Sequence, residues 1–277
     1  MRSNDDSSSA ESKPRGRGSL SAKVPAFVAL WLAWAGLLAA AMVLGNTGWG
    51  LALGRDSAGG HGSIEATAAR MGSSLTLVVV GWLAFASWRR SPAARFALCI
   101  AIGMTAGALG DFFNAGWLDF VPLGNPVLGG IVAFGLGHIA YITGCIDLAK
   151  RAGPIAPRPM VIAVAAWQLV GLAGWCFVAL QGTLARALVW PALPYSLLLA
   201  GTAGVTSGLA LEDRRWVPLA LGAALFLASD LILAFELFRG HFAYDTECVW
   251  LTYGPGQMLI VFSTIIAAAA ARRSMPT

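Results

Sequence analysis

Eight long runs of apolar residues divide the 277-residue sequence, and they constrain its fold more than any other feature. An α-helix needs about 20 apolar residues to cross the hydrocarbon core of a bilayer, and most of the runs approach this length. The runs cover residues 24–45, 72–88, 94–112, 126–149, 160–181, 187–210, 216–238 and 249–271. Because backbone groups in lipid must be hydrogen-bonded within the protein, such runs favour helices. We therefore predict an all-α, polytopic integral membrane bundle of eight transmembrane helices.

The Lys and Arg residues support this count because they fall unevenly between alternate loops. If all eight runs cross the bilayer, 15 of the 19 basic residues lie on the side of the two termini. Only Arg55, Arg70, Arg186 and Arg239 lie on the opposite side. Basic residues concentrate in cytoplasmic loops, so the pattern predicts that both termini are cytoplasmic. We expect a multi-pass protein of the cytoplasmic (inner) membrane of a bacterium.

The segments outside the runs are short and polar. Residues 1–23 are rich in Ser, Gly and charge, which predicts a disordered cytoplasmic tail ahead of a membrane domain at 24–271. Residues 272–277 form a short cytoplasmic C-terminal tail in this interpretation. The segment 46–71 contains Gly59, Gly60 and His61, and we expect a mobile loop with a short interfacial helix from Ile64 to Arg70.

Several classes of function are excluded or disfavoured by the composition. Apolar residues make up 57% of the chain and charged residues 12%, and the excess of positive charge follows the loops, so we expect no nucleic-acid partner. The four cysteines show no CxxC spacing, which argues against a disulfide framework or a structural zinc ion. Only three histidines exist, no GxSxG or P-loop motif occurs, and no Lys lies within a run. We therefore expect neither a metal nor another cofactor.

A few ionisable or strongly polar residues lie inside the runs, where each costs free energy unless it is paired or hydrated. These candidate site residues are Asp111, His138, Tyr141, Tyr195, Ser229, Asp230, Tyr253 and Gln257. At roughly 1.5 Å per residue, most of them fall between the outer membrane boundary and roughly 18 Å below it, with Asp111 closest to the boundary. The sequence therefore predicts a cavity that opens to the outer half of the bilayer.

Each candidate also has a purely structural interpretation. His138 could form a hydrogen bond between helices, and Tyr195 and Tyr253 could belong to the aromatic belt at the membrane surface. Asp230 is the hardest to explain in this way, because it lies well inside an apolar run with only Ser229 beside it as a polar neighbour.

The order and spacing of four motifs resemble one known family. The motifs are Gly110-Asp111, the segment GHIAY at 137–141, the segment GAALFLASD at 222–230 and the segment YGPGQ at 253–257. Together they resemble the YhhN-like lysoplasmalogenase family over roughly residues 70 to 270. One departure is that the family usually begins its second span with Lys-Pro, whereas this chain has Gly72-Ser73-Ser74-Leu75. Arg70 is the residue that could substitute for any phosphate-binding role of that lysine.

The resemblance implies an eight-span enzyme that hydrolyses the vinyl ether bond of lysoplasmalogens. Its products would be a fatty aldehyde and a glycerophospho-ethanolamine or -choline, and its partner would be a lysophospholipid in the bilayer. Carried over to this chain, the suspected catalytic pair is Asp111 and Asp230. His138, Tyr141, Tyr253 and Gln257 would be substrate-binding residues of the pocket, and we add Tyr195 and Ser229.

Vinyl ether hydrolysis needs a proton donor and a group that activates water. We hypothesise that the deeper Asp230 is the acid and that Asp111, closer to water, is the base or the stabiliser of the cation. Two other classes stay open. The same carboxylates could relay protons in a transporter of lipids or small solutes, or the polar residues could merely pair within a lipid-binding membrane protein.

Overall fold

A computed structural model describes residues 24–45, 64–122, 125–151 and 157–273, and every regular element in these ranges is helical. Eight of the helices are long and apolar enough to cross a membrane, which confirms the predicted fold. The long helices are α2 (Val24–Gly45), α4 (Ile64–Trp88), α5 (Ala94–Asn114), α6 (Pro126–Arg151), α7 (Pro157–Gly174), α8 (Val189–Glu212), α9 (Val217–Arg239) and α10 (Asp245–Arg273). The π-helical turn η1 (Trp175–Leu180) extends α7, and the 3-10 turns η2 (Arg186–Leu188) and η3 (Arg214–Trp216) precede α8 and α9.

The start of α4 corrects one prediction. Residues Ile64 to Arg70, expected as a separate interfacial helix, form the first turns of the 25-residue α4. Glu65 in the first turn suits the positive end of the helix dipole. Arg70, which the sequence places in an outer loop, therefore lies inside a membrane helix. The predicted tail at 1–23, the glycine-rich loop around Gly59 and the last residues, 274–277, lie outside the described residues.

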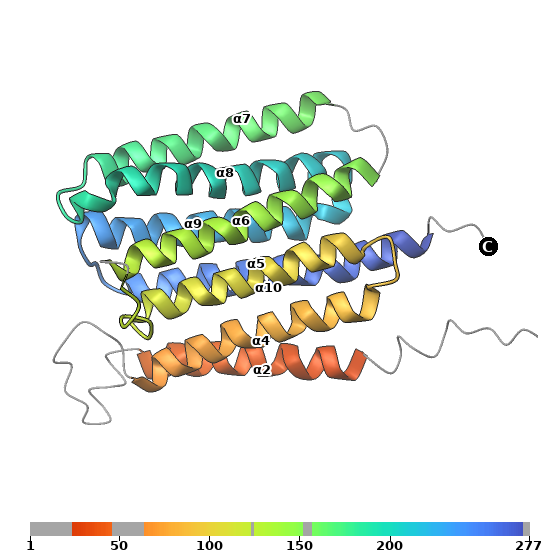
Figure 1. The fold of residues 1–277 in the computed structure, drawn as a ribbon, viewed down its shortest axis with the longest axis horizontal. Coiled ribbons are helices and arrows are strands. Elements are labelled where there is room, and N and C mark those ends of the chain that lie inside the picture. The colour runs from red at the N-terminus through yellow and green to blue at the C-terminus, as the bar shows by residue number, and fades with distance from the viewer. Residues whose placement is uncertain (1–23, 46–63, 123–124, 152–156, 274–277) are drawn as a thin grey trace, which may run out of the picture.

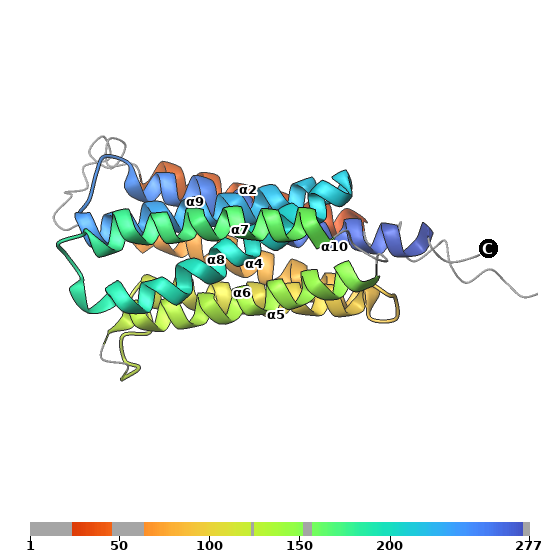
Figure 2. The same cartoon turned by 90° about the horizontal axis from the view of Figure 1, so that it is seen from above.

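The long helices run roughly parallel and extend along the same axis (Figures 1 and 2). α10 lies centrally, because it packs against α9, α4, α5 and α2. At the right-hand end of Figure 1, where the chain continues from α4 to α5, from α6 to α7 and from α8 to α9, the described helix ends carry most of the basic residues. The opposite end, which we call the loop end, holds the connections from α5 to α6, from η1 to η2 and from α9 to α10.

Glycines allow the closest helix contacts in the bundle. A Cβ on Gly110 of α5 would lie 2.5 Å from the ring of Phe134 on α6, and a Cβ on Gly103 would lie 2.0 Å from Cε1 of Tyr141. Gly107, one turn beyond Gly103 on α5, faces α10 at Gln257. These positions let α5 approach two neighbours at once.

Large apolar side chains remain exposed along the outer faces of the bundle. They include Leu32 on α2, Val161 and Leu169 on α7, and Phe262 on α10. A water-soluble monomer rarely exposes so many apolar side chains, whereas a bilayer covers them. The protein is therefore a multi-pass integral membrane protein.

Candidate active site

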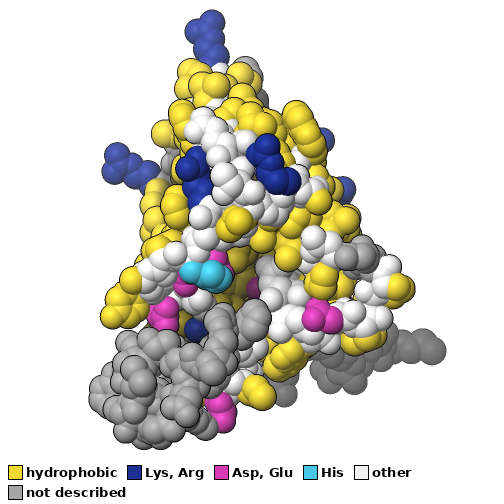
Figure 3. Space-filling model, turned by 90° about the vertical axis from the view of Figure 1, so that its left-hand side faces the viewer, with side chains coloured by type: hydrophobic (Ala, Val, Ile, Leu, Met, Phe, Trp, Pro, Cys, Tyr) yellow, Lys and Arg dark blue, Asp and Glu magenta, His cyan; other side chains and the backbone are white. Residues whose placement is uncertain are grey.

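A cavity of about 200 Å³ opens at the loop end, between α4, α5, α6, α9 and α10. Both predicted catalytic aspartates line it, together with a buried arginine and three aromatic residues, Phe134, Trp250 and Tyr253, which we call the aromatic wall. The residues that line it include Arg70, Asp111, Phe134, Asp230, Trp250 and Tyr253. Figure 3 looks onto this end, where acidic side chains and a histidine gather around a hollow. We refer to this space as the polar cavity.

Asp111 is held by side chains from two other helices. Ser74 Oγ of α4 donates a hydrogen bond of 2.6 Å to Asp111 Oδ2, and the Tyr253 hydroxyl of α10 donates one of 2.9 Å to the same oxygen. Gln257, one turn further along α10, donates a short hydrogen bond to the Tyr253 hydroxyl. The network therefore joins four polar groups inside the bundle and fixes the orientation of the carboxyl group.

Asp230 has a different set of partners on the other side of the polar cavity. The Tyr195 hydroxyl of α8 donates a short hydrogen bond to Asp230 Oδ2, and Ser229 Oγ approaches Oδ1 at 3.4 Å. The better hydrogen bond of Ser229 goes to the Phe226 carbonyl at 2.7 Å. Behind Asp230, a small apolar space of about 50 Å³ lies between α7, α8 and α9. Each aspartate is thus held by one tyrosine hydroxyl from a neighbouring helix.

The exposure of the two aspartates is the reverse of what their heights along the helices suggested. Asp111, expected near the water boundary, is only 6% exposed, whereas Asp230 is half-buried. The reason is the direction in which each side chain points from its helix. Asp111 points toward α4 and α10 in the interior of the bundle, and a residue count along a helix gives the height of a side chain but not this direction.

His138 and Tyr141 lie behind the aromatic wall and do not line the polar cavity. His138 is 1% exposed, and its Nδ1 lies 2.9 Å from Thr202 Oγ1 of α8. Its ring packs against Phe226 with centroids 4.6 Å apart. His138 Nε2 and the Tyr141 hydroxyl have no hydrogen-bond partner among the described residues. To bind substrate as predicted, His138 and Tyr141 would therefore have to act through the residues of the aromatic wall, or the aromatic wall would have to move.

The sequence alone predicted neither Arg70 and Trp250 at the polar cavity nor Ser74 beside Asp111. It placed Arg70 in an outer loop, as a substitute for the family's lysine, and Ser74 only within a departure from a motif. Arg70 and Ser74 are four residues apart and so share one face of α4, and Trp250 and Tyr253 share one face of α10. With α4 beginning at Ile64, the four-residue spacing of Arg70 and Ser74 predicts that both face the same side of the helix.

A charged cluster lies at the mouth of the polar cavity. His241 Nδ1 lies 2.8 Å from Asp245 Oδ2 and 3.2 Å from Glu236 Oε1. The hydrogen bond to Asp245 and the negative charge of Glu236 raise the pKa of His241. Ligand atoms of the three side chains lie within 4.8 Å of one another, a spacing that could hold a metal ion. Asp245 also accepts hydrogen bonds from the backbone N–H groups of Phe242 and Thr246, so these bonds explain its position at the start of α10 without a metal.

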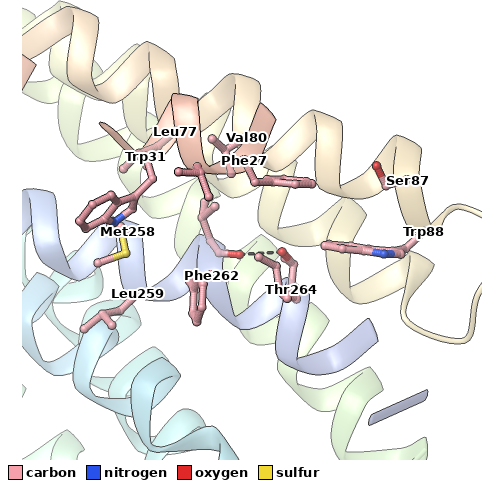
Figure 4. A pocket seen from close by; sticks show the side chains of 13 residues that line it. Phe27, Trp31, Leu77, Val80, Ser87, Trp88, Met258, Leu259, Phe262 and Thr264 are labelled. Atoms are coloured by element: carbon pink, nitrogen blue, oxygen red, sulfur yellow. Dashed lines mark hydrogen bonds between the residues drawn. The ribbon is translucent and has the colours of Figure 1, made fainter. Parts of the chain in front are cut away.

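A second, apolar groove of about 590 Å³ lies between α2, α4 and α10 (Figure 4). Phe27 and Trp31 of α2, Leu77 of α4, and Met258 and Phe262 of α10 line it. The groove continues the face of α4 that carries Arg70 and Ser74 toward the basic end of the bundle. We refer to it as the apolar groove.

Comparison with known proteins gives a consistent set of matches. Residues 70–264 match the model of the YhhN family. The chain is 29% identical to a protein of Homo sapiens named lysoplasmalogenase TMEM86A and 30% identical to the protein of that name from Bos taurus. Each alignment covers 174 residues, which is 60% of this chain and 65% of the relative, slightly less than two thirds of the relative's length. No solved structure matches the chain significantly.

Proposed function

The chain belongs to the YhhN family, and we propose that it is a membrane-embedded hydrolase that cleaves the vinyl ether bond of lysoplasmalogens. Relatives named lysoplasmalogenase support this activity. The observation that carries the proposal is that Asp111 and Asp230 line one cavity, each oriented by the hydroxyl of a tyrosine. The products would be a fatty aldehyde and a glycerophospho-ethanolamine or -choline.

The hydrogen bonds favour one division of labour between the two carboxyl groups. A carboxylate that accepts two good hydrogen bonds is stabilised as an anion, and Asp111 accepts them from Ser74 and Tyr253. Asp230 has a single strong donor in Tyr195. We assign Asp230 as the proton donor and Asp111 as the carboxylate that stabilises the cation and activates water.

The reaction then proceeds in two balanced stages. Asp230 transfers its proton to the β-carbon of the vinyl ether, which leaves an oxocarbenium ion at the carbon bonded to oxygen. Water adds to that carbon and loses a proton to Asp111, which gives a hemiacetal. Breaking the carbon–oxygen bond of the hemiacetal releases the aldehyde and the glycerol hydroxyl, and the proton balance between the two carboxyl groups is restored through water.

The arrangement of the polar cavity and the apolar groove suits a lipid with a single chain. On both α4 and α10, the residues nearer the loop end line the polar cavity, and the residues further from it line the apolar groove. Of the two partners of Asp111, Ser74 lies between the cavity and the groove on α4, and Tyr253 is the polar-cavity residue of α10 nearest the groove. A lysolipid with its headgroup at the loop end and its chain in the groove would bring its vinyl ether to the level of Asp111.

The proposed orientation follows from charge. The basic end of the bundle would face the cytoplasm with both termini, and in a bacterium the membrane would be the cytoplasmic membrane. The polar cavity would then open on the opposite face. The tails at 1–23 and 272–277 would lie in the cytoplasm, outside the membrane domain.

The experiment is turnover by the detergent-purified full chain. Lysoplasmenylethanolamine should release aldehyde, whereas the 1-alkyl lysolipid of the same chain length, which lacks the double bond, should remain intact. Folded wild-type protein that releases no aldehyde would reject the hydrolase. Proton-coupled movement of lipid or solute in vesicles of the same preparation would then favour a transporter, and binding without movement a lipid-binding protein.

A further inference from the structure

Arg70 is a buried cation without a close partner among the residues that the structure describes. It is 6% exposed and lines the polar cavity, and its Nε has no hydrogen-bond partner within those residues. Glu247, in the first turn of α10, attracts the guanidinium electrostatically, but within the described part of the chain no side chain forms an ion pair or hydrogen bond with it. A charge inside a membrane protein is costly unless an opposite charge or water compensates it. The position therefore suits an anionic ligand that enters the cavity.

The surroundings of Arg70 hold its guanidinium at the loop end of the polar cavity. The guanidinium carbon lies 5.9 Å from the centre of the Trp250 ring, a cation–π distance. A Cβ at Gly45, the last residue of α2, would lie 2.6 Å from Arg70 Nη2, so the guanidinium also lies against the end of that helix. Trp250 in turn packs on Tyr253, with ring centres 5.3 Å apart. Arg70 is thus connected to Asp111 through two aromatic rings, those of Trp250 and Tyr253.

The distance along α4 matches the layout of a lysophospholipid. Arg70 is one helical turn closer to the loop end than Ser74, the partner of Asp111, which corresponds to roughly 6 Å of backbone. In a lysoplasmalogen, five bonds join the ether oxygen to the phosphorus, and such a chain spans roughly 6 Å when extended. A lipid whose vinyl ether reaches Asp111 would therefore carry its phosphate toward Arg70.

We propose that Arg70, backed by Trp250, is the subsite that binds the phosphodiester of the lysolipid headgroup. The planar guanidinium can donate two parallel hydrogen bonds to phosphate oxygens, which a lysine cannot do. The inference builds on the proposed function, because that function supplies the lipid. Its binding test below does not require turnover.

The test uses two uncleavable ligands, of which only one carries the phosphoethanolamine headgroup. A saturated 1-alkyl lysophosphatidylethanolamine and the 1-alkylglycerol of the same chain length are titrated into the full chain, and Trp fluorescence reports binding. We expect the wild type to bind the phospholipid more tightly. Arg70→Gln should weaken phospholipid binding roughly 10- to 100-fold, the usual effect of a lost charged hydrogen bond, and leave alkylglycerol binding unchanged. Arg70→Lys should weaken phospholipid binding by an intermediate factor. This variant provides the test if Arg70→Gln does not fold.

Arg239→Gln is the matched control, since Arg239 is an exposed cation at the same end that does not line the polar cavity. It should bind both ligands as the wild type does. A folded Arg70 variant that keeps the full preference for the phospholipid would overturn the subsite, as would inorganic phosphate that binds as tightly as the lipid. Loss of the preference in a protein that never releases aldehyde would leave the subsite standing and reject only the hydrolase.

Discussion

At the scale of single residues, the site contains two carboxyl groups whose hydrogen-bond partners differ. Asp111 sits in a network from three helices, whereas Asp230 depends on Tyr195 and lies beside a small apolar space. The tyrosines are therefore positioning residues in the proposed mechanism. Each hydroxyl donates a hydrogen bond to one aspartate and so fixes the orientation of a proposed catalytic group.

Tyr195→Phe should lower kcat roughly 10-fold, because the change removes the hydrogen bond that orients the proposed acid without emptying the space of the ring. KM should change little, since the hydroxyl contacts Asp230 and not the lipid in our proposal. Steady-state kinetics on lysoplasmenylethanolamine separate the two constants. Tyr244→Phe, which changes an exposed tyrosine at the same end, should behave as the wild type. Equal kcat values for the two variants would show that Tyr195 does not position Asp230.

His241 should make the stability of the protein depend on pH. Its folded-state pKa is raised by Asp245 and Glu236, so the cluster stabilises the fold fully below about pH 6.5, the ordinary value for histidine. The contribution is lost as the pH rises through the raised value and the imidazole loses its proton. The effect should be small because His241 is mostly exposed. Thermal unfolding at pH 6 and pH 8.5 should differ less in His241→Gln than in the wild type, and an unchanged difference would contradict this explanation.

At the scale of helices, the glycines of α5 set how closely the walls of the site approach. Gly103 accepts the ring of Tyr141, Gly110 that of Phe134, and Gly107 leaves room for Gln257. Glycine is abundant in the sequence, but the sequence alone does not show which helix each glycine faces. The same limit explains α4, whose polar first turns resemble a loop in sequence because part of them faces the polar cavity.

Gly103→Ala should destabilise the bundle by about 1–3 kcal/mol, because the added methyl group would collide with the buried Tyr141 ring. Gly36→Ala is the matched control, since Gly36 lies inside α2 with no atom within 4 Å of a Cβ there. That change should be neutral or slightly stabilising. Thermal unfolding in detergent compares the two, and equal midpoints would show that α5 and α6 tolerate a wider spacing.

At the scale of the whole molecule, the sequence predicted the eight spans correctly, because apolar length is a strong signal in a membrane protein. It predicted the family correctly from the order and spacing of four motifs. It also placed Asp111, Asp230 and Tyr253 at one cavity. It did not separate these residues from His138, which shares their end of the bundle but lies behind Phe226. Height in the membrane is readable from a sequence, whereas the direction of a side chain depends on the packing of all the helices.

The orientation of the bundle is open to a direct test by thiol labelling. In a background with Cys176 and Cys248 changed to Ser, a cysteine at Pro92, in the α4–α5 connection, should react only from the cytoplasmic side. A cysteine at Thr183, between η1 and η2, should react with a membrane-impermeant reagent added to intact cells. The opposite pattern would reverse the proposed topology.

The most direct test of the central claim is aldehyde release by Asp111→Asn and Asp230→Asn, each compared with Asp119→Asn. Asp119 is an exposed aspartate at the same end that does not line the polar cavity. We predict that both cavity variants unfold at the wild-type temperature within a few degrees and lose at least roughly 100-fold in kcat/KM, as expected when an acid or base is removed. Asp119→Asn should retain full activity. Full turnover by either cavity variant would contradict the proposal that the two aspartates catalyse the reaction.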